Sequence, residues 1–148
     1  MGQRSILICL LVLGFASCSS TNNEEYLVGE WYNESLRVDI DALDGKADSV
    51  FLVPVGSWEE ILQIKPINTN FRPDGTYESV YYNLDGSELQ RSSGEWQMKS
   101  DSLYLTSQGQ TTGYYFQWQE GKATFEGYLD WDTDGHADDF YSGVQIKK

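Results

Sequence analysis

Residues 114–129 read YYFQWQEGKATFEGYL, and this stretch decides the fold class. Apolar and polar side chains alternate on both sides of the turn Glu120-Gly121. A period of two indicates β-strands with one buried face, and a glycine turn between two such runs predicts an antiparallel hairpin. The side chains expected to face inward are those of Tyr114, Phe116, Trp118, Ala123, Phe125, Gly127 and Leu129.

The same alternation recurs in shorter runs at residues 94–99, 102–106 and 140–146. Turn dipeptides such as Asp74-Gly75 and Asp85-Gly86 separate the runs. Short strands with short links predict an all-β fold, an antiparallel up-and-down barrel of about eight strands. The inward residues expected in these three runs are Trp96, Met98, Leu103, Leu105, Phe140, Val144 and Ile146.

The region before these runs is less regular. Residues 50–55 resemble a strand, but Pro54 cannot donate a ladder hydrogen bond, which favours an edge position or an irregular segment. Residues 57–62 are expected to form a short helix capped by Ser57. The alternative is that these residues form no helix and continue directly into a strand at residues 62–65. Residues 35–56 are expected to be an insertion after the first strand.

The stretch that follows the hairpin is acidic: residues 130–139 read DWDTDGHADD and hold five aspartates. Four of them fall at positions 1, 3, 5 and 9 of a loop, and Gly135 falls at position 6. In this register carboxylate oxygens converge on one hard cation while the glycine makes the sharp bend. The predicted ligands are Asp130, Asp132, Asp134, Asp138 and the backbone carbonyl of His136.

Calcium suits this loop, because it takes about six to eight oxygen ligands. Position 12 is Tyr141, where an EF-hand has a glutamate, and the flanks read as strands. The pattern is similar to the shorter calcium loops of integrin-type propeller repeats and thrombospondin type 3 repeats, in which the ninth position closes the site. We expect an affinity on the order of 10⁻⁴–10⁻³ M. The alternative is an acidic hairpin tip without an ion.

The strand alternation also predicts where these carboxylates lie. Leu129 and Trp131 continue the inward row, so Asp130 and Asp132 are expected to point away from the core, at one rim of the barrel. Asp139 is one residue too far along for the loop register, and we expect it to lie outside the ligand set or to face solvent.

The N-terminus has the features of a targeting segment. Residues 1–17 are predicted to be a lipoprotein signal peptide, because Arg4 precedes an apolar run at residues 6–15 that is too short to span a membrane. The run ends in Phe-Ala-Ser-Cys, which resembles a lipobox in which Cys18 receives the lipid. An ordinary secretory peptide is the alternative.

Residues 18–25 are polar and are expected to form a flexible tether before a single domain at residues 26–148. Glu24 and Glu25 resemble surface-export signals of some Gram-negative gut anaerobes. The expected location is therefore the outer membrane of a Gram-negative envelope, with exposure at the cell surface as an option, and the lipid anchor makes the membrane a partner.

The composition of the chain excludes several classes of function. The net charge is −13 at pH 7, which argues against a nucleic-acid partner. The chain has two cysteines, and Cys9 lies in the predicted signal peptide, so no internal disulfide is expected after cleavage. The one histidine lies in the acidic loop, and no nucleophile–base pair or zinc spacing can be singled out. We therefore expect no enzymatic activity.

Several motifs together resemble the bacterial lipocalin-like lipoproteins. They are Gly29-Glu30-Trp31, the FRPDGTY stretch at residues 71–77, Gly94-Glu95-Trp96 with Leu103-Tyr104-Leu105, and the closing acidic loop. The resemblance covers most of residues 26–148. It implies an up-and-down barrel of about eight strands in which Trp31 closes the narrow end.

Two classes of function remain. The first is a lipid-anchored binding protein that holds a small apolar ligand inside the barrel, or a glycan or envelope protein on a surface marked by exposed tyrosines such as Tyr82 and Tyr115. The second is a structural accessory lipoprotein of an envelope complex, with a packed aromatic core and calcium as a rigidifier. The residues expected to line an interior ligand site are Tyr77, Tyr81, Tyr114, Phe116 and Trp118.

Overall fold

The computed structural model describes residues 23–42 and 46–148. The predicted signal peptide, Cys18 and the first part of the tether lie outside the described residues. Within these ranges no helix is long and apolar enough to cross a membrane. The elements are α1 (Asn23–Leu27), β1 (Gly29–Ile40), β2 (Ser49–Val53), α2 (Trp58–Leu62), β3 (Asn68–Phe71), β4 (Thr76–Tyr82), β5 (Glu88–Lys99), β6 (Ser102–Ser107), β7 (Gln110–Gln119), β8 (Lys122–Leu129) and β9 (Asp139–Lys147).

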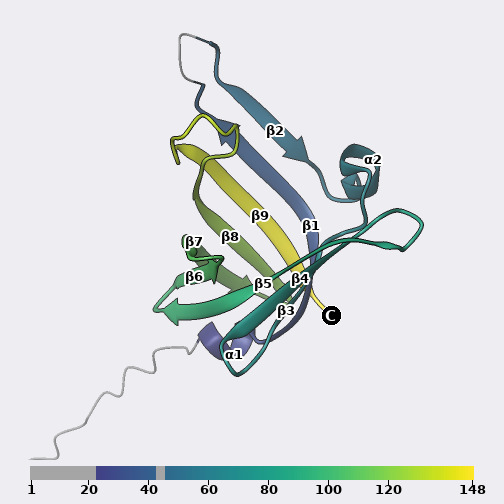
Figure 1. Ribbon diagram of the computed structural model, residues 1–148, viewed down its shortest axis with the longest axis vertical. Coiled ribbons are helices and arrows are strands. Elements are labelled where there is room, and N and C mark those ends of the chain that lie inside the picture. The colour runs from purple at the N-terminus through teal and green to yellow at the C-terminus, as the bar shows by residue number, and fades with distance from the viewer. Residues whose placement is uncertain (1–22, 43–45) are drawn as a thin grey trace, which may run out of the picture.

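Eight antiparallel strands close into a barrel (Figure 1). The hydrogen-bonded order runs from β1 through β3, β4, β5, β6, β7 and β8 to β9, which pairs with β1 again. The closing pair extends from Trp31 opposite Lys147 to Asp39 opposite Phe140. The predicted all-β barrel of about eight strands is confirmed.

The strand β2 lies outside this ring, and the length of β1 explains why. Residues 29–32 of β1 pair with β3, and residues 36–40 pair with β2 on the same side. A register shift between Asn33 and Ser35 lets both Trp31 and Leu36 face inward. The expected insertion at residues 35–56 is therefore wrong at its start, because this bulge interrupts the alternation without ending the strand. β2 ends before Pro54 as an edge strand.

The barrel interior contains two clusters of buried side chains. The larger one fills the end that α1 covers, and Trp31 meets Trp118 and Phe125 edge to face there, with ring centroids 5.6 and 6.3 Å apart. The smaller one lies under β2 and α2 and consists of Leu36, Val38, Val53 and Trp58. A cavity inside the barrel lies between the two clusters.

Helix α1 covers one end of the barrel (Figure 1). Leu27 is fully buried, and its carbonyl accepts a 2.7 Å hydrogen bond from Trp31 Nε1. Asn23 Nδ2 donates to Asp101 Oδ1 at 2.7 Å. Residues 23–25, expected to belong to the flexible tether, are therefore helical, because burial of Leu27 and these bonds outweigh the polarity of Glu24 and Glu25.

Helix α2 confirms the expected short helix. Trp58 is buried on its inner side. Ser57 precedes it, but the expected cap is not formed, because the Ser57 side chain makes no hydrogen bond to the first turn. Packing of Trp58, and not capping, therefore holds this helix in place.

The face that β9 presents to the interior differs from the prediction. Tyr141 packs against both core clusters and Gln145 lines the interior cavity, whereas Ile146 is 37% exposed. Phe140 packs outside the barrel against Tyr128, with ring centroids 5.5 Å apart. The expected inward positions Phe140, Val144 and Ile146 are thus wrong. Phe140 and Tyr141 are adjacent aromatic residues, so the sequence allows either of them to face the interior. Because Asp139 is buried, the alternating residue Tyr141 faces inward and Phe140 faces outward.

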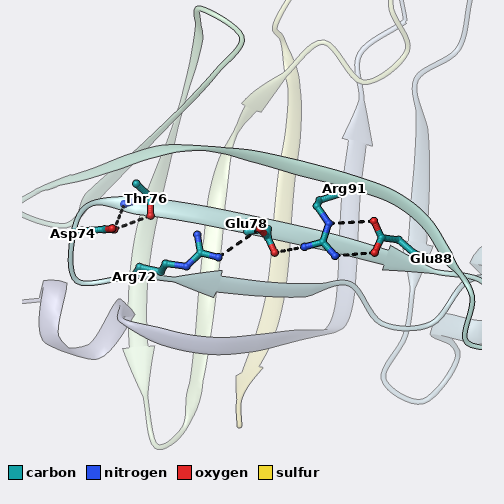
Figure 2. Close-up of polar contacts among 6 residues, drawn as sticks. All are labelled: Arg72, Asp74, Thr76, Glu78, Glu88 and Arg91. Atoms are coloured by element: carbon teal, nitrogen blue, oxygen red, sulfur yellow. Dashed lines mark hydrogen bonds and ion pairs between the residues drawn. The ribbon is translucent and has the colours of Figure 1, made fainter.

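Linked charges cover the outer face of β3–β5 (Figure 2). Glu78 lies between Arg72, whose Nη2 is 3.4 Å from Glu78 Oε1, and Arg91. Arg91 also donates to Glu88 Oε2 at 2.7 Å. All four side chains are partly exposed, so solvent screens each of these pairs. The chain of pairs joins β4 to β5 without forming a binding site.

Candidate functional site

The acidic loop between β8 and β9 lies at the end of the barrel opposite α1 (Figure 1). Three of its aspartates accept hydrogen bonds from the loop's own backbone. Asp130 Oδ2 accepts from Gly135 N at 3.1 Å, and Asp132 Oδ1 accepts from Asp134 N at 3.2 Å. Asp134 Oδ1 accepts from His136 N at 2.8 Å. Gly135 has a φ of 96°, which makes the bend that the sequence assigned to it.

Two loop oxygens have no partner. Asp134 Oδ2 and Asp138 Oδ1 are shielded from solvent, and neither has a hydrogen-bond partner among the described residues. A buried carboxylate oxygen without a partner is costly. The backbone bonds therefore satisfy some of the loop's carboxylate oxygens and leave these two as acceptors, which fits a hard cation that binds oxygen.

The sequence left two placements open for Asp139, outside the ligand set or facing solvent. It is fully buried, so the placement in solvent is wrong. Its Oδ2 accepts hydrogen bonds from Trp131 N at 2.7 Å and Asp132 N at 3.2 Å, and its Oδ1 accepts from Asp41 N at 2.9 Å. These three bonds explain why a carboxylate can be buried here, and they tie the loop to the end of β1.

The structure groups the aspartates differently from the loop register. Among the described residues, one group has carboxylate oxygens within 4.8 Å of one another, and it consists of Asp130, Asp132 and Asp139. Asp130 and Asp132 are exposed at the rim, as expected. Asp134 and Asp138 are not in this group and contribute the two shielded oxygens instead. His136 is exposed, and its backbone N–H bonds to Asp134.

The second candidate site is a cavity of about 160 Å³ inside the barrel, between the two core clusters. Its wall is more polar than expected. Gln145 Oε1 is buried there and has no hydrogen-bond partner in the part of the chain that the structure describes. Thr69 Oγ1 lies 2.8 Å from Ser79 Oγ. The lining consists of Asn33, Ile67, Thr69, Phe71, Ser79, Tyr81, Leu105, Tyr114, Phe125, Tyr141 and Gln145.

Three tyrosines of this cavity stay protonated. Burial raises the pKa of Tyr114 to about 12, and nearby Tyr77 and Tyr81 add to the effect. Burial also raises the pKa of Tyr141 and of Tyr81 above the usual value of 10. Their hydroxyl groups are therefore neutral near pH 7 and can both donate and accept hydrogen bonds.

The five residues expected to line an interior site are divided by the structure. Tyr81 and Tyr114 line the cavity. Tyr77 and Phe116 are buried in the larger core cluster, and Trp118 stacks on Tyr26 with ring centroids 5.5 Å apart. Alternation alone identified the inward face, but it does not distinguish a residue that fills the barrel from one that lines a cavity. Gln145 was missed because the face of β9 was assigned incorrectly.

Comparisons with known proteins identify no family for this chain. No family model and no curated protein matches this chain. A crystal structure of an uncharacterized protein from Bacteroides eggerthii DSM 20697 is similar, with a TM-score of 0.49 and 14% sequence identity. The similarity covers 82% of this chain and 99% of the other.

Proposed function

We propose that this chain is a lipid-anchored, non-enzymatic binding protein of the bacterial cell envelope whose acidic loop holds a calcium ion. The observation that carries the proposal is the loop itself. Its backbone N–H groups orient Asp130, Asp132 and Asp134. Asp134 Oδ2 and Asp138 Oδ1 are shielded and find no partner within residues 23–42 and 46–148. A doubly charged cation would pair these oxygens and offset the repulsion among the aspartates.

Titration calorimetry of the full-length protein, freed of metal with a chelator, tests this proposal. Addition of calcium chloride should release or absorb heat with a dissociation constant on the order of 10⁻⁴–10⁻³ M. The double variant D132N/D134N should lose this heat. D85N is the matched control, because Asp85 lies in another Asp-Gly turn and also accepts a backbone hydrogen bond.

Two results of the titration would contradict the calcium site. One is the absence of heat from the unchanged protein at millimolar calcium. The other is equal heat in the D132N/D134N variant. Magnesium chloride is the ionic control, because magnesium keeps several waters and should bind this loop less well.

The anchor is supported by the lipobox-like run that ends at Cys18, which lies outside the described residues. Metabolic labelling of expressing cells with an alkyne fatty acid should modify the full-length chain. C18A should abolish the label and release the protein from the membrane fraction. Labelling that persists in C18A would contradict lipidation at this residue.

The interior cavity favours a second candidate activity, the binding of a small polar molecule. Its 160 Å³ is below the roughly 300–1,000 Å³ of ordinary ligand pockets, and an apolar ligand would leave Gln145 Oε1 unpaired. Glycerol, erythritol or ribose should shift the NMR signal of the Gln145 side-chain amide. Displacement of a fatty-acid dye would instead support the apolar ligand, and an amide signal that no probe moves would indicate bound water only.

A further inference from the structure

The outer faces of β6, β7, β8 and β9 form a groove of about 340 Å³ that neither candidate site uses. We call it the tyrosine groove and define it by Tyr104, Gly113, Tyr115, Glu126, Tyr128 and Phe140, all of which line it. Leu103, Phe116 and Phe125 of the same strands face the core. The groove is therefore on the outside of the barrel.

The strand register explains why the surface is hollow here. Tyr104 lies opposite Gly113, and a Cβ atom added to Gly113 would lie 3.3 Å from the Tyr104 ring. Gly127 lies opposite the inward-facing Tyr141, so its missing side chain is on the inner face and only its backbone borders the groove. The floor of the groove is consequently bare backbone, and aromatic rings stand on either side of it.

The rings beside this floor are exposed and held in place. Tyr128 is 65% exposed and Tyr115 is 45% exposed. Tyr128 packs edge to face on Phe140, and Lys99 Nζ lies 5.5 Å from the centre of the Tyr104 ring. Exposed aromatic rings that are already ordered lose little conformational entropy when a ligand stacks on them.

The polar groups of the groove and the net charge of the protein indicate which class of ligand the groove would bind. Glu126 accepts a hydrogen bond from Ser142 at 3.2 Å through Oε1, so its other oxygen is available to a hydroxyl group. Glu126 is the one acidic or basic residue in the lining. With a net charge of −13, the protein repels uronic acids and sulfated sugars. The β7–β8 ladder ends where Tyr115 lies opposite Glu126, so the groove lies where these two strands part.

We propose that the tyrosine groove binds a neutral glycan, whose pyranose faces stack on Tyr115 and Tyr128 above the Gly113 floor. A sugar ring offers apolar C–H faces to an aromatic ring and hydroxyl groups to Glu126, which is the combination this groove presents. The inference rests on the proposed role as a binding protein, and it requires neither the calcium ion nor the interior cavity.

Calorimetry and saturation-transfer NMR on the full-length protein in a sugar-free detergent test the proposal. The probes are malto-, cello-, xylo- and manno-hexaose, with an oligogalacturonate as the acidic comparison. At least one neutral hexaose should bind and the oligogalacturonate should not. Y115A and Y128A should each weaken binding about tenfold, whereas Y128F, which keeps the ring, should retain it.

Two further variants separate the groove from a general effect on folding. G113V should fill the floor and abolish binding while the thermal midpoint stays close to that of the unchanged protein. Tyr82, which we expected to share a surface with Tyr115, lies on β4 and outside the groove, so Y82A should bind as the unchanged protein does. These variants leave the acidic loop intact, so calcium binding can be scored independently.

Three results would overturn the proposal. They are no binding of any neutral hexaose at millimolar concentration, binding that survives both Y115A and Y128A, and preference for the oligogalacturonate. Capture of an envelope protein that competes for Tyr128 while no sugar binds would also overturn it, because the groove would then be a protein interface.

Discussion

At the scale of single residues, Asp139 has the largest structural effect of the aspartates near the acidic loop. It is fully buried and is held by the N–H groups of Asp41, Trp131 and Asp132. A buried carboxylate with three such donors is stable, whereas one that loses a donor or its charge is not. The residue that organises the loop is thus not one of the predicted ligands.

Replacement D139N should therefore destabilise the protein even without calcium. The amide can accept hydrogen bonds on one side only, and its N–H₂ group would face a backbone donor. We expect a loss of about 1–3 kcal/mol in the free energy of unfolding, measured by urea denaturation in chelator. D85N, at an exposed turn, should change little, and equal stability of D139N would refute this role.

The raised pKa of Tyr114 predicts how the free energy of unfolding changes in alkaline solution. Its pKa is about 12 in the folded chain against about 10 in the unfolded chain, so the unfolded state releases its proton first. The stabilisation is fully present below pH 10 and is lost as the pH rises toward 12, by about 2–3 kcal/mol. Y114F should remove this part of the decline. Parallel alkaline denaturation curves for the two proteins would contradict the assignment.

At the scale of elements, β5 shows why a motif glycine is required. Gly94 lies opposite Tyr77, and a Cβ atom there would lie 2.1 Å from Thr106 O and 2.9 Å from the Tyr77 ring. Backbone is the closer obstacle, so neighbouring β6 would have to move. The close approach of β5 to β6 at this point therefore depends on the missing side chain.

The substitution G94A should lower the free energy of unfolding by about 1–3 kcal/mol, the range found for overpacked cores. G113A is the control, because its new methyl group would meet only the Tyr104 ring, at 3.3 Å. Thermal denaturation should place G94A clearly below G113A. A midpoint for G94A at or above that of the control would contradict the packing argument.

The strands also show how much of the fold can be predicted from the sequence. Alternation in β5–β8 and the glycine turns predict the barrel correctly, because a half-buried strand forces a period of two. The bulge in β1 has no such signal, and its effect reaches Leu36. The face of β9 depends on Asp139, whose buried carboxylate accepts from two nearby backbone donors and from Asp41, which is distant in sequence. Strand alternation placed Asp130 and Asp132 at the rim, but it did not find Gln145 in the cavity.

At the scale of the whole molecule, the negative charge of the protein and the closure of the barrel meet at the acidic loop. The net charge of −13 is carried by a barrel whose last strand pairs with its first, and the acidic loop adjoins that closing pair. An ion in the loop would bind the folded chain and not the unfolded one, so it would stabilise the barrel as a unit.

Calcium at 10 mM should therefore raise the free energy of unfolding by about 1–3 kcal/mol, given the expected affinity. Sodium chloride at equal ionic strength is the control, because any salt screens the repulsion among so many carboxylates. The D132N/D134N variant should respond to both salts alike. A calcium effect no larger than that of sodium in the unchanged protein would exclude a specific ion.

The two ends of the barrel differ in one further respect. The chain enters at the end that α1 and Trp31 plug, and the acidic loop lies at the far end. A molecule tethered through its N-terminus would stand on the bilayer as a short post with its negatively charged tip outermost. Ions dissolved in the surrounding medium, and not those gathered at lipid headgroups, would then occupy the acidic loop and determine how strongly it is stabilised.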